Sequence, residues 1–192
     1  SDFAGSTLVH STGGWAALTG AIILGARKGK YGSDGQIKAL PGANIPLATL
    51  GTFILWFGWF GFNGGSQLAL GSALNATAIS IVYVNTNLAA AAGVVVAIVL
   101  AQFSYKKIDV SLALNGAIGG LVAITAGPDL QNHLIAIVVG GIGGGLVVIA
   151  VPWIDKMKID DVVGAISAHL IAGIWGTLAV GIFGSGSIIT QA

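Results

Sequence analysis

Six long apolar stretches follow one another along this chain, separated by shorter connections. They cover residues 3–26, 45–62, 73–103, 110–125, 134–153 and 162–183. About 20 helical residues cross a hydrocarbon core about 30 Å thick. Charged residues make up only 8% of the chain, whereas a soluble domain carries about a quarter. The sequence therefore predicts an all-α, polytopic membrane helical bundle with six transmembrane helices.

The positive charges fall on alternate connections between these stretches. All eight Lys and Arg residues lie in the first, third and fifth connections, as Arg27, Lys28, Lys30 and Lys38, then Lys106 and Lys107, then Lys156 and Lys158. Loops rich in Lys and Arg stay on the cytoplasmic side of a membrane. We therefore expect a multi-pass protein of the plasma or inner cell membrane, with both ends of this chain outside.

A motif, Asp-x-x-Gly-x4-His-x3-Gly, occurs in the first stretch and again in the last. Its residues are Asp2, Gly5, His10 and Gly14, then Asp161, Gly164, His169 and Gly173. The charge pattern gives the two copies opposite orientations, which is typical of an inverted repeat with its site near the bilayer midplane. Eight residues at 1.5 Å each place either histidine about 12 Å inward from its own face. We expect the two histidines to face each other at mid-membrane.

Histidine inside a membrane is costly, so a functional role is the default hypothesis. The alternative is a neutral imidazole that forms a hydrogen bond between helices. A facing pair could share and pass on a proton, or bind a small polar solute. A metal site is less favoured, because the pair lacks further Cys, Asp or Glu ligands at its depth. Asp2 and Asp161 are each expected to cap a helix N-terminus, and Asp2 could also stabilise a cation arriving from outside.

Glycines are interspersed in two of the predicted helices. An aromatic segment, residues 56–66, ends the second stretch and reads WFGWFGFNGGS. It is either an interfacial aromatic belt or a pore mouth that attracts cations, and Gly58, Gly61, Gly64 and Gly65 would permit close packing on one face. The glycine run at 140–145 lies within a predicted helix and follows no strand. We expect a packing surface there and no nucleotide loop.

Four segments carry a resemblance to a known family. They are DFAGSTLVHSTGGWAALTGAIILGAR at 2–27, GWFGFNGGS at 58–66, NGAIGGLVAITAG at 115–127 and DDVVGAISAHLIAGIWGTLAVGIF at 160–183. The chain resembles the ammonium transporter (Amt) family over essentially its whole length. The resemblance implies a homotrimer of eleven-helix subunits, each with a narrow hydrophobic pore made by two inverted five-helix repeats. Residues 1–192 would then be a partial transporter domain, with the last helix of the first repeat at 1–27 and the second repeat at 45–185.

The resemblance also implies roles for individual residues. His10 and His169 are similar to the twin pore histidines, and Asp2 to the buried acid that supports an outer ammonium site. Ser66 matches the hydroxyl of that site, Phe62 a gating phenylalanine and Trp59 a pore-lining ring. The expected function is ammonium transport, with ammonium recruited outside and ammonia conducted past the histidines, with or without a separately moved proton.

Several other functions remain to be weighed against transport. The same fold could sense ammonium and signal through a cytoplasmic module, and a two-histidine haem or metal bundle is a further alternative. The absence of cysteine excludes disulfides and thiol nucleophiles within these residues, and no basic cluster suggests nucleic acid. We expect no enzyme activity, no cofactor and no metal. The expected partners are ammonium or ammonia, the lipid bilayer and a cytoplasmic regulator of the PII type.

Overall fold

The computed structural model describes residues 1–184, and within them the only regular elements are helices. Their bounds are η1 Ser6–Ser11, α1 Thr12–Leu24, α2 Ile45–Gly65, α3 Ala73–Tyr105, α4 Val110–Ile124, α5 His133–Lys156, η2 Ile166–Ile171 and α6 Ala172–Phe183. The two η elements are π-helical and run directly into α1 and α6. Every predicted stretch therefore contains helix, which confirms the all-α bundle.

Side-chain caps explain where the four middle helices begin. Asn44 accepts the N–H of Leu47, Ser72 that of Asn75, Asp109 that of Leu112 and Asn132 that of Leu134, at 2.9–3.2 Å. Such caps satisfy amide groups that the first helical turn leaves unpaired. Each capping residue lies in a short polar connection, so the observed helix starts agree with the predicted stretches to within a residue or so.

Five of the helical segments are long and apolar enough to cross a membrane, and α4 is the exception. It has 15 residues, which corresponds to about 22 Å of helix. The chain is thus a multi-pass membrane protein in which the fourth of six predicted spans is shorter than the others. Two tight turns follow α4, in which the N–H of Thr125 donates to the carbonyl of Val122 and the N–H of Gly127 to that of Ile124.

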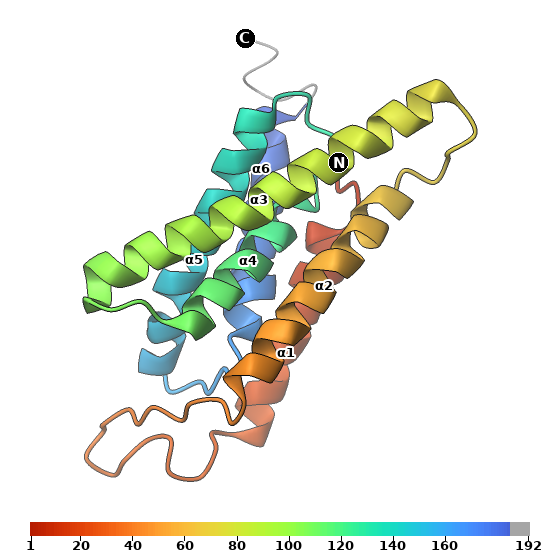
Figure 1. Ribbon diagram of the computed structural model, residues 1–192. Coiled ribbons are helices and arrows are strands. Elements are labelled where there is room, and N and C mark those ends of the chain that lie inside the picture. Colours follow the sequence, from red (N-terminus) through yellow and green to blue (C-terminus); the bar gives the residue numbers. More distant parts are fainter. Residues whose placement is uncertain (185–192) are drawn as a thin grey trace.

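Glycine allows α3, α4 and α5 to pack closely, and α3 crosses the other two in Figure 1. A Cβ added to Gly119 would lie 2.9 Å from the carbonyl oxygen of Gly143, and one added to Gly120 would lie 3.3 Å from that of Gly140. Small residues let helix backbones approach in this way in membrane proteins. The glycine run of α5 is a packing surface, as predicted.

The glycines of the aromatic segment of α2 differ in how closely other parts of the chain approach them. A Cβ added to Gly58, Gly61 or Gly65 would have no neighbour within 4 Å among the described residues, whereas one at Gly64 would contact the ring of Tyr83. Within residues 1–184, close packing in this segment is therefore observed at Gly64.

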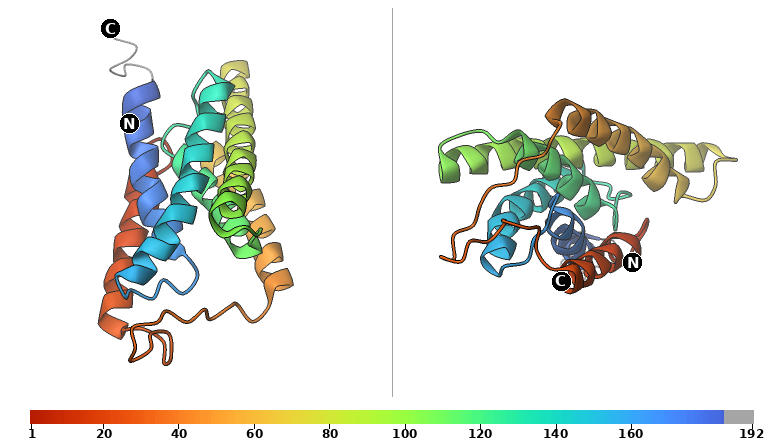
Figure 2. Two further views of the ribbon diagram at one scale, coloured as in Figure 1. Left: turned by 90° about the vertical axis from the view of Figure 1, so that its left-hand side faces the viewer. Right: turned by 90° about the horizontal axis from the view of Figure 1, so that it is seen from below.

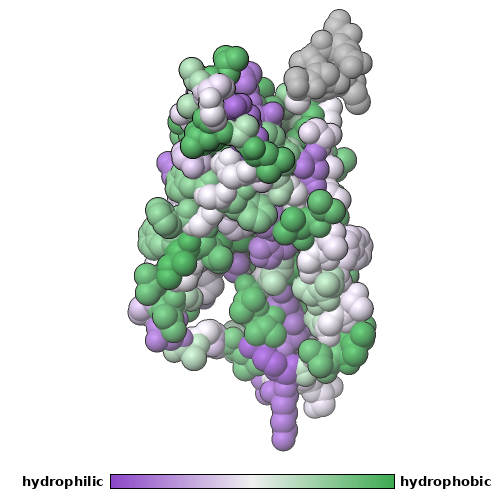
Figure 3. All heavy atoms as spheres, turned by 90° about the vertical axis from the view of Figure 1, so that its right-hand side faces the viewer, coloured by the Kyte–Doolittle hydropathy of each residue, from purple (hydrophilic) through white to green (hydrophobic). Residues whose placement is uncertain are grey.

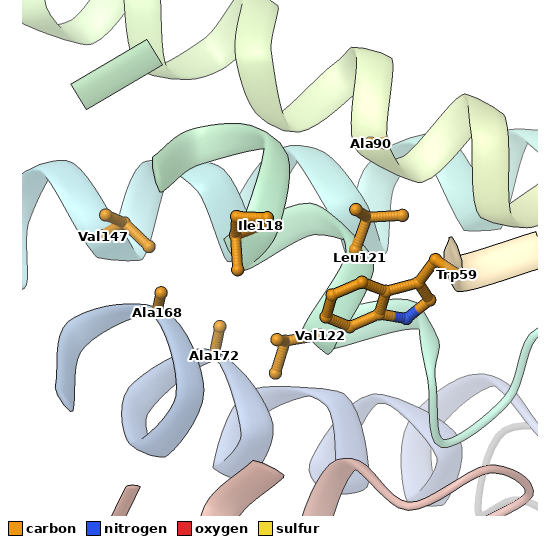
Figure 4. Packing of buried hydrophobic residues seen from close by; sticks show 8 residues of the cluster. All are labelled: Trp59, Ala90, Ile118, Leu121, Val122, Val147, Ala168 and Ala172. Atoms are coloured by element: carbon orange, nitrogen blue, oxygen red, sulfur yellow. The ribbon is translucent and has the colours of Figure 1, made fainter. Parts of the chain in front are cut away.

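A central cluster of apolar side chains joins α2, α3, α4, α5, η2 and α6. Figure 4 shows its members, which are Trp59, Ala90, Ile118, Leu121, Val122, Val147, Ala168 and Ala172. Trp59 is the one aromatic residue among them and lies beside Leu121 and Val122. This cluster fixes α2 against α4, and it places the Trp59 ring next to the helices that carry the two histidines.

The long axis of the molecule separates the connections by charge. In Figures 1 and 2 the loop between α1 and α2 lies at one end, and the start of η1 and the end of α6 lie toward the other. Figure 3 shows hydrophobic side chains over much of the face and hydrophilic ones extending from the lower end. Exposed apolar residues on the outer helix surfaces, such as Ile23, Phe57 and Leu134, agree with a protein that lies in a bilayer.

Candidate functional site

The first histidine helix begins at a glycine turn and an acid. Gly5 has φ 108°, outside the region that side-chain-bearing residues favour. Asp2 Oδ2 accepts the N–H groups of Thr7 at 3.1 Å and Leu8 at 2.9 Å. The turn that follows is π-helical, since the N–H of His10 donates to the carbonyl of Gly5, five residues back.

The second histidine helix repeats this arrangement. Gly164 has φ 76°, and Asp161 accepts the N–H of Ile166 through Oδ1 and that of Ser167 through Oδ2, both at 3.1 Å. Ser167 also donates its hydroxyl to Oδ2 at 3.3 Å. The predicted capping by both acids is confirmed. A difference remains, since both oxygens of Asp161 are bonded whereas Asp2 Oδ1 is buried without a partner among the described residues.

The two histidines meet, as the spacing of the motif predicted. His10 Nδ1 lies 3.2 Å from His169 Nδ1, and the two rings meet edge to edge, with centroids 5.3 Å apart and planes 23° apart. Two neutral imidazoles can form this bond only if one Nδ1 donates and the other accepts. The pair therefore has a direction, with an Nε2–H at one end and a free Nε2 lone pair at the other.

Glycines allow the two histidine helices to cross. A Cβ added to Gly14 would lie 2.6 Å from the Cα of Leu170, next to His169. One added to Gly173 would lie 2.7 Å from the carbonyl oxygen of Ser6. Both glycines belong to the repeated motif. The last glycine of each motif thus contacts the backbone of the other histidine helix. This close approach brings the two imidazoles within hydrogen-bonding distance.

Two aromatic rings of α2 flank His10. The Trp59 ring is stacked on it, with centroids 5.0 Å apart and planes 15° apart, and the Phe62 ring is tilted at 5.5 Å. Trp59 is buried, whereas Phe62 is 39% exposed. Ser66 lies one turn beyond Phe62 and donates its hydroxyl to the Phe62 carbonyl at 2.8 Å. The hydroxyl oxygen of Ser66 keeps lone pairs that can accept a bond from a ligand.

A small pocket lies against the histidine pair. Its volume is about 240 Å³, and it is lined by Val9, His10, Gly13, Ala17, Ala165 and His169. Apart from the two imidazoles, the lining is apolar. His10 Nε2 is buried without a hydrogen-bond partner among the described residues. Among the residues that line this pocket, the two histidines are therefore the only ones with a polar side chain.

Several hydroxyl groups near the site, other than that of Ser66, were not singled out in the sequence. Thr125 accepts the Nε1–H of Trp59 at 2.9 Å, and the Thr7 and Thr177 hydroxyls form a hydrogen bond that links η1 to α6. Ser6 donates to the carbonyl of Val122 at 2.7 Å. Their signal in the sequence is a polar residue within an apolar stretch, and this signal is too common to identify a site without the fold.

The predicted metal alternative has little in the structure to support it. Within residues 1–184 no group of three or more His, Cys, Asp or Glu side chains is placed to hold a metal ion. The third histidine, His133, starts α5 and lies away from the pair, with Nδ1 2.7 Å from Asn85 Oδ1. Asn85 donates its amide to two carbonyls of the loop before α5, so His133 Nδ1 is the donor to it.

Charged side chains attach the segment that precedes the second histidine helix to the first loop. Arg27 forms two bonds to Asp160, from Nε at 2.8 Å and Nη2 at 2.9 Å, and Lys30 Nζ lies 2.8 Å from Asp155. The guanidinium lowers the pKa of the Asp160 carboxyl to about 2, mainly through the side-chain hydrogen bond. The first loop is thereby joined to the segment that leads into η2.

Comparison with known sequences gives a consistent result over the whole chain. Residues 1–192 match the sequence profile of the Ammonium Transporter Family. The chain is 48% identical over 186 residues to ammonium transporter Amt2 of Archaeoglobus fulgidus, which covers 97% of this chain and 39% of that protein. It is 45% identical over 184 residues to a putative ammonium transporter of Synechocystis sp., covering 95% and 41%.

Solved structures agree with the sequence comparison. A structure named Sensor Amt Protein superimposes with a TM-score of 0.91 at 46% identity, covering 96% of this chain and 44% of that one. Saccharomyces cerevisiae Mep2 gives a TM-score of 0.81 at 32% identity, covering 96% and 40%. The chain thus spans about 40% of the length of the relatives it matches.

Proposed function

Because the chain belongs to the ammonium transporter family, we propose that it forms part of a pore that recruits ammonium outside the cell and conducts ammonia past His10 and His169. The observation that carries this proposal is the hydrogen-bonded pair of imidazoles on the wall of a small, otherwise apolar pocket. Such a wall suits a small neutral solute that can accept and donate hydrogen bonds, since a bare cation would be costly to desolvate there.

The outer recruitment site is proposed to include Asp2, Phe62 and Ser66. A hydroxyl oxygen and the face of an aromatic ring both attract a cation. Phe62 is partly exposed and lies beside His10, and its ring is proposed to separate the outer side from the imidazole pair. Asp2 adds a negative charge whose Oδ1 has no bond among the described residues. Ammonium would be held by these groups and lose its proton as the nitrogen passes Phe62.

The histidine pair can then form hydrogen bonds with ammonia, and it can also transfer a proton. Ammonia can donate to a free Nε2 lone pair or accept from an Nε2–H, and the pair offers one of each. It can also carry a proton. A proton that binds the free Nε2 of His10 allows the Nδ1 proton to move to Nδ1 of His169, which then releases its Nε2 proton on the other side. One proton is passed and the direction of the pair is reversed. Trp59 is proposed to line this passage through its stack on His10.

The test uses a full-length transporter that contains this chain. His10→Ala and His169→Ala should each lower the ammonium-dependent current about tenfold or change its selectivity over potassium, since the polar contact in the pocket is lost. His133→Ala is the matched control, because His133 lies at the start of α5 outside the pocket, and its current should stay within about twofold. Unchanged current and selectivity in both pore variants would refute the proposed function.

The similarity to the same relatives also supports an assignment of this chain to parts of a larger transporter fold. We propose that residues 1–27 are the last helix of one five-helix repeat and 45–185 a second repeat, although residue 185 lies outside the described residues. The support is that the two capped histidine helices start from opposite ends of the molecule (Figure 2). The relatives are named as transporters and not as enzymes. A homotrimer with a cytoplasmic regulator of the PII type completes the proposal, and cross-linking of the full-length protein in membranes tests the trimer.

Sensing is a second candidate function, and one observation favours it. The structural relative with a TM-score of 0.91 is named Sensor Amt Protein. A sensor would bind ammonium at the same outer site and alter the activity of a cytoplasmic signalling module. The complete gene discriminates between the two, since a sensor requires a signalling module joined to this fold. Ammonium binding without ammonium current in the full-length protein would favour sensing, and a current that the histidine variants abolish would favour transport.

A further inference from the structure

Thr125 joins two elements of the candidate site. It directly follows α4 and is fully buried. Its hydroxyl oxygen accepts the Nε1–H of Trp59 at 2.9 Å, and its carbonyl accepts the N–H of Ala4 at 2.9 Å. Trp59 belongs to α2, whereas Ala4 directly precedes the glycine turn of η1. A single residue therefore connects the helix that carries the indole to the segment that leads to His10.

The direction of the Thr125 hydroxyl is fixed by its second bond. A hydroxyl has one hydrogen to donate, and the carbonyl of Leu121 receives it at 2.7 Å. The oxygen lone pairs of Thr125 are therefore available only as acceptors, and one of them faces the indole N–H. Since a buried indole N–H needs an acceptor, this bond determines how the Trp59 ring is turned about its side-chain torsions.

The orientation of the Trp59 ring in turn limits the orientation of His10. The two rings are nearly parallel, with planes 15° apart and centroids 5.0 Å apart. An imidazole that lies flat against a fixed indole keeps its edge, and not its face, toward its other neighbour. That edge carries Nδ1, which lies 3.2 Å from Nδ1 of His169. A rotated indole would leave His10 free to turn Nδ1 away.

We propose that Thr125 is a positioning residue for the histidine pair, acting through the hydroxyl–indole bond and the indole–imidazole stack. Thr125 has no contact of its own with the pocket, so its effect reaches the solute only through Trp59 and His10. The inference rests on the proposed function, because its consequence is the rate at which a solute passes His10. It predicts that this hydroxyl is required for rapid passage and is unimportant for recruitment outside Phe62.

The first test is Thr125→Val in the full-length transporter, which removes the hydroxyl while keeping the side-chain shape. The maximal transport rate per assembled protein should fall about tenfold, because the buried indole N–H loses its acceptor. The ammonium concentration that gives half-maximal rate should stay within about twofold, because Ser66 and Phe62 are unchanged. Thr125→Ser restores the hydroxyl and should recover most of the rate. A Val variant with an unchanged maximal rate, or a Ser variant as slow as Val, overturns the proposal.

Thr86→Val is the matched control for general loosening of α2. Thr86 is equally buried and accepts the amide of Asn63, one turn along α2 from Trp59, at 2.9 Å. The same substitution there also leaves a buried donor without its acceptor, but it does not touch the indole–imidazole stack. Its maximal rate per assembled protein should remain within about twofold of the parent. A loss as large as that of Thr125→Val would overturn the positioning role.

A spectroscopic measurement separates this inference from the proposed function. The ultraviolet resonance Raman band of indole that reports N–H hydrogen bonding should shift in Thr125→Val and return in Thr125→Ser, with Trp59→Phe assigning the band. If His10→Ala leaves transport unchanged, the proposed function fails, yet the Raman shift still tests the Thr125–Trp59 bond. If His10→Ala abolishes transport while Thr125→Val shows neither the Raman shift nor a slower rate, only the positioning role fails.

Discussion

The segments leading into the two histidine helices share a motif but are held to the bundle by different groups. Before η1, the N–H groups of Phe3 and Ala4 donate to the carbonyls of Ala126 and Thr125, both at 2.9 Å. Before η2, charged side chains hold the chain, since Arg27 pairs with Asp160 and Lys30 pairs with Asp155. The first attachment is neutral main chain, and the second consists of ion pairs near the loop end of the molecule.

The two kinds of attachment respond differently to pH and salt. Hydrogen bonds between neutral backbone groups are nearly independent of pH and salt. Ion pairs near an aqueous surface are screened by salt and lost on titration. The Arg27 side chain is 37% exposed, so its pairing with Asp160 is open to both effects. We therefore expect the attachment of η1 to be insensitive to pH and salt, and the attachment of η2 to weaken at low pH and in high salt.

The largest effect is expected from the glycine turns. Gly5→Ala should destabilise the protein by about 2–3 kcal/mol and Gly164→Ala by about 1–2 kcal/mol. The added Cβ at Gly5 would lie 2.7 Å from Val9 Cγ2 at φ 108°, whereas at Gly164 it would lie 2.9 Å from the Asn115 amide nitrogen at φ 76°. Thermal unfolding of the full-length protein in detergent measures both.

Gly25→Ala separates backbone strain from steric contact in that experiment. Gly25 has φ 73°, but an added Cβ would have nothing within 4 Å. It should cost less than either substitution in the motif, because only the positive φ is unfavourable there. An equal loss at Gly5 and Gly25 would show that the contact with Val9 contributes nothing.

The next effect concerns the two capping acids. Asp2→Asn should lower ammonium transport about tenfold with little loss of stability, because one oxygen holds both helix amides and the charge is proposed to act on ammonium. Asp161→Asn should lower stability by about 1 kcal/mol, since both of its oxygens are bonded. Transport rates and melting temperatures of the two proteins give the comparison. The reverse ranking in either measurement would contradict the different roles assigned to the acids.

A smaller effect is expected from the ion pair at the start of η2. Arg27→Gln should destabilise the protein by about 1 kcal/mol at neutral pH, and less in high salt. The pKa of Asp160 is lowered from 3.8 to about 2, so the stabilisation is fully present above about pH 4 and is lost as pH falls toward 2. Melting temperature followed from pH 5 to pH 2 should therefore fall more steeply for the parent than for the variant. Parallel curves would refute a contribution from this pair.

The smallest effect at neutral pH is expected from Tyr31→Phe. Tyr31 donates to Asp155 at 3.2 Å, and its loss should cost about 0.5 kcal/mol. Burial, followed by the charge of Asp155, raises the pKa of Tyr31 from 10.0 to about 12. A raised pKa favours the protonated form in the folded state, so its stabilisation is present below about pH 10 and is lost between pH 10 and 12. The parent should lose more stability over that interval than Tyr31→Phe, and parallel alkaline melting curves would contradict this.

Much of the fold followed from the sequence, because apolar runs and capping residues are local signals. The meeting of His10 and His169 was also predictable, since the repeated motif and the charge pattern together fixed their depth and orientation. Which glycines of the aromatic segment lie against another helix could not be predicted, because the sequence does not reveal which side of α2 faces a neighbouring helix. Interleaved glycine and aromatic residues occur on both kinds of surface.

Other parts of the site depend on contacts between residues far apart in the chain. The Trp59–Thr125 bond joins the end of α4 to the middle of α2, and the Arg27–Asp160 pair joins residues 133 positions apart. In the sequence, Arg27 was interpreted only as a topology signal, and Thr125 as one residue of an apolar stretch. Their partners are set by helix packing, so only the structure could identify them.

The extra residue in each π-helical turn sets the direction in which the histidine side chain leaves its helix, and the two imidazoles meet only if both directions are kept. Each residue of an α-helix advances the direction of its side chain by about 100°, and a π turn holds one residue more than an α turn. Removing one residue, such as Thr7 or Ala168, would let either turn close as α-helix and would rotate that histidine by about 100° relative to its own cap. Such a deletion takes away none of the Asp, Gly or His positions of the motif, and it would still separate the two imidazoles.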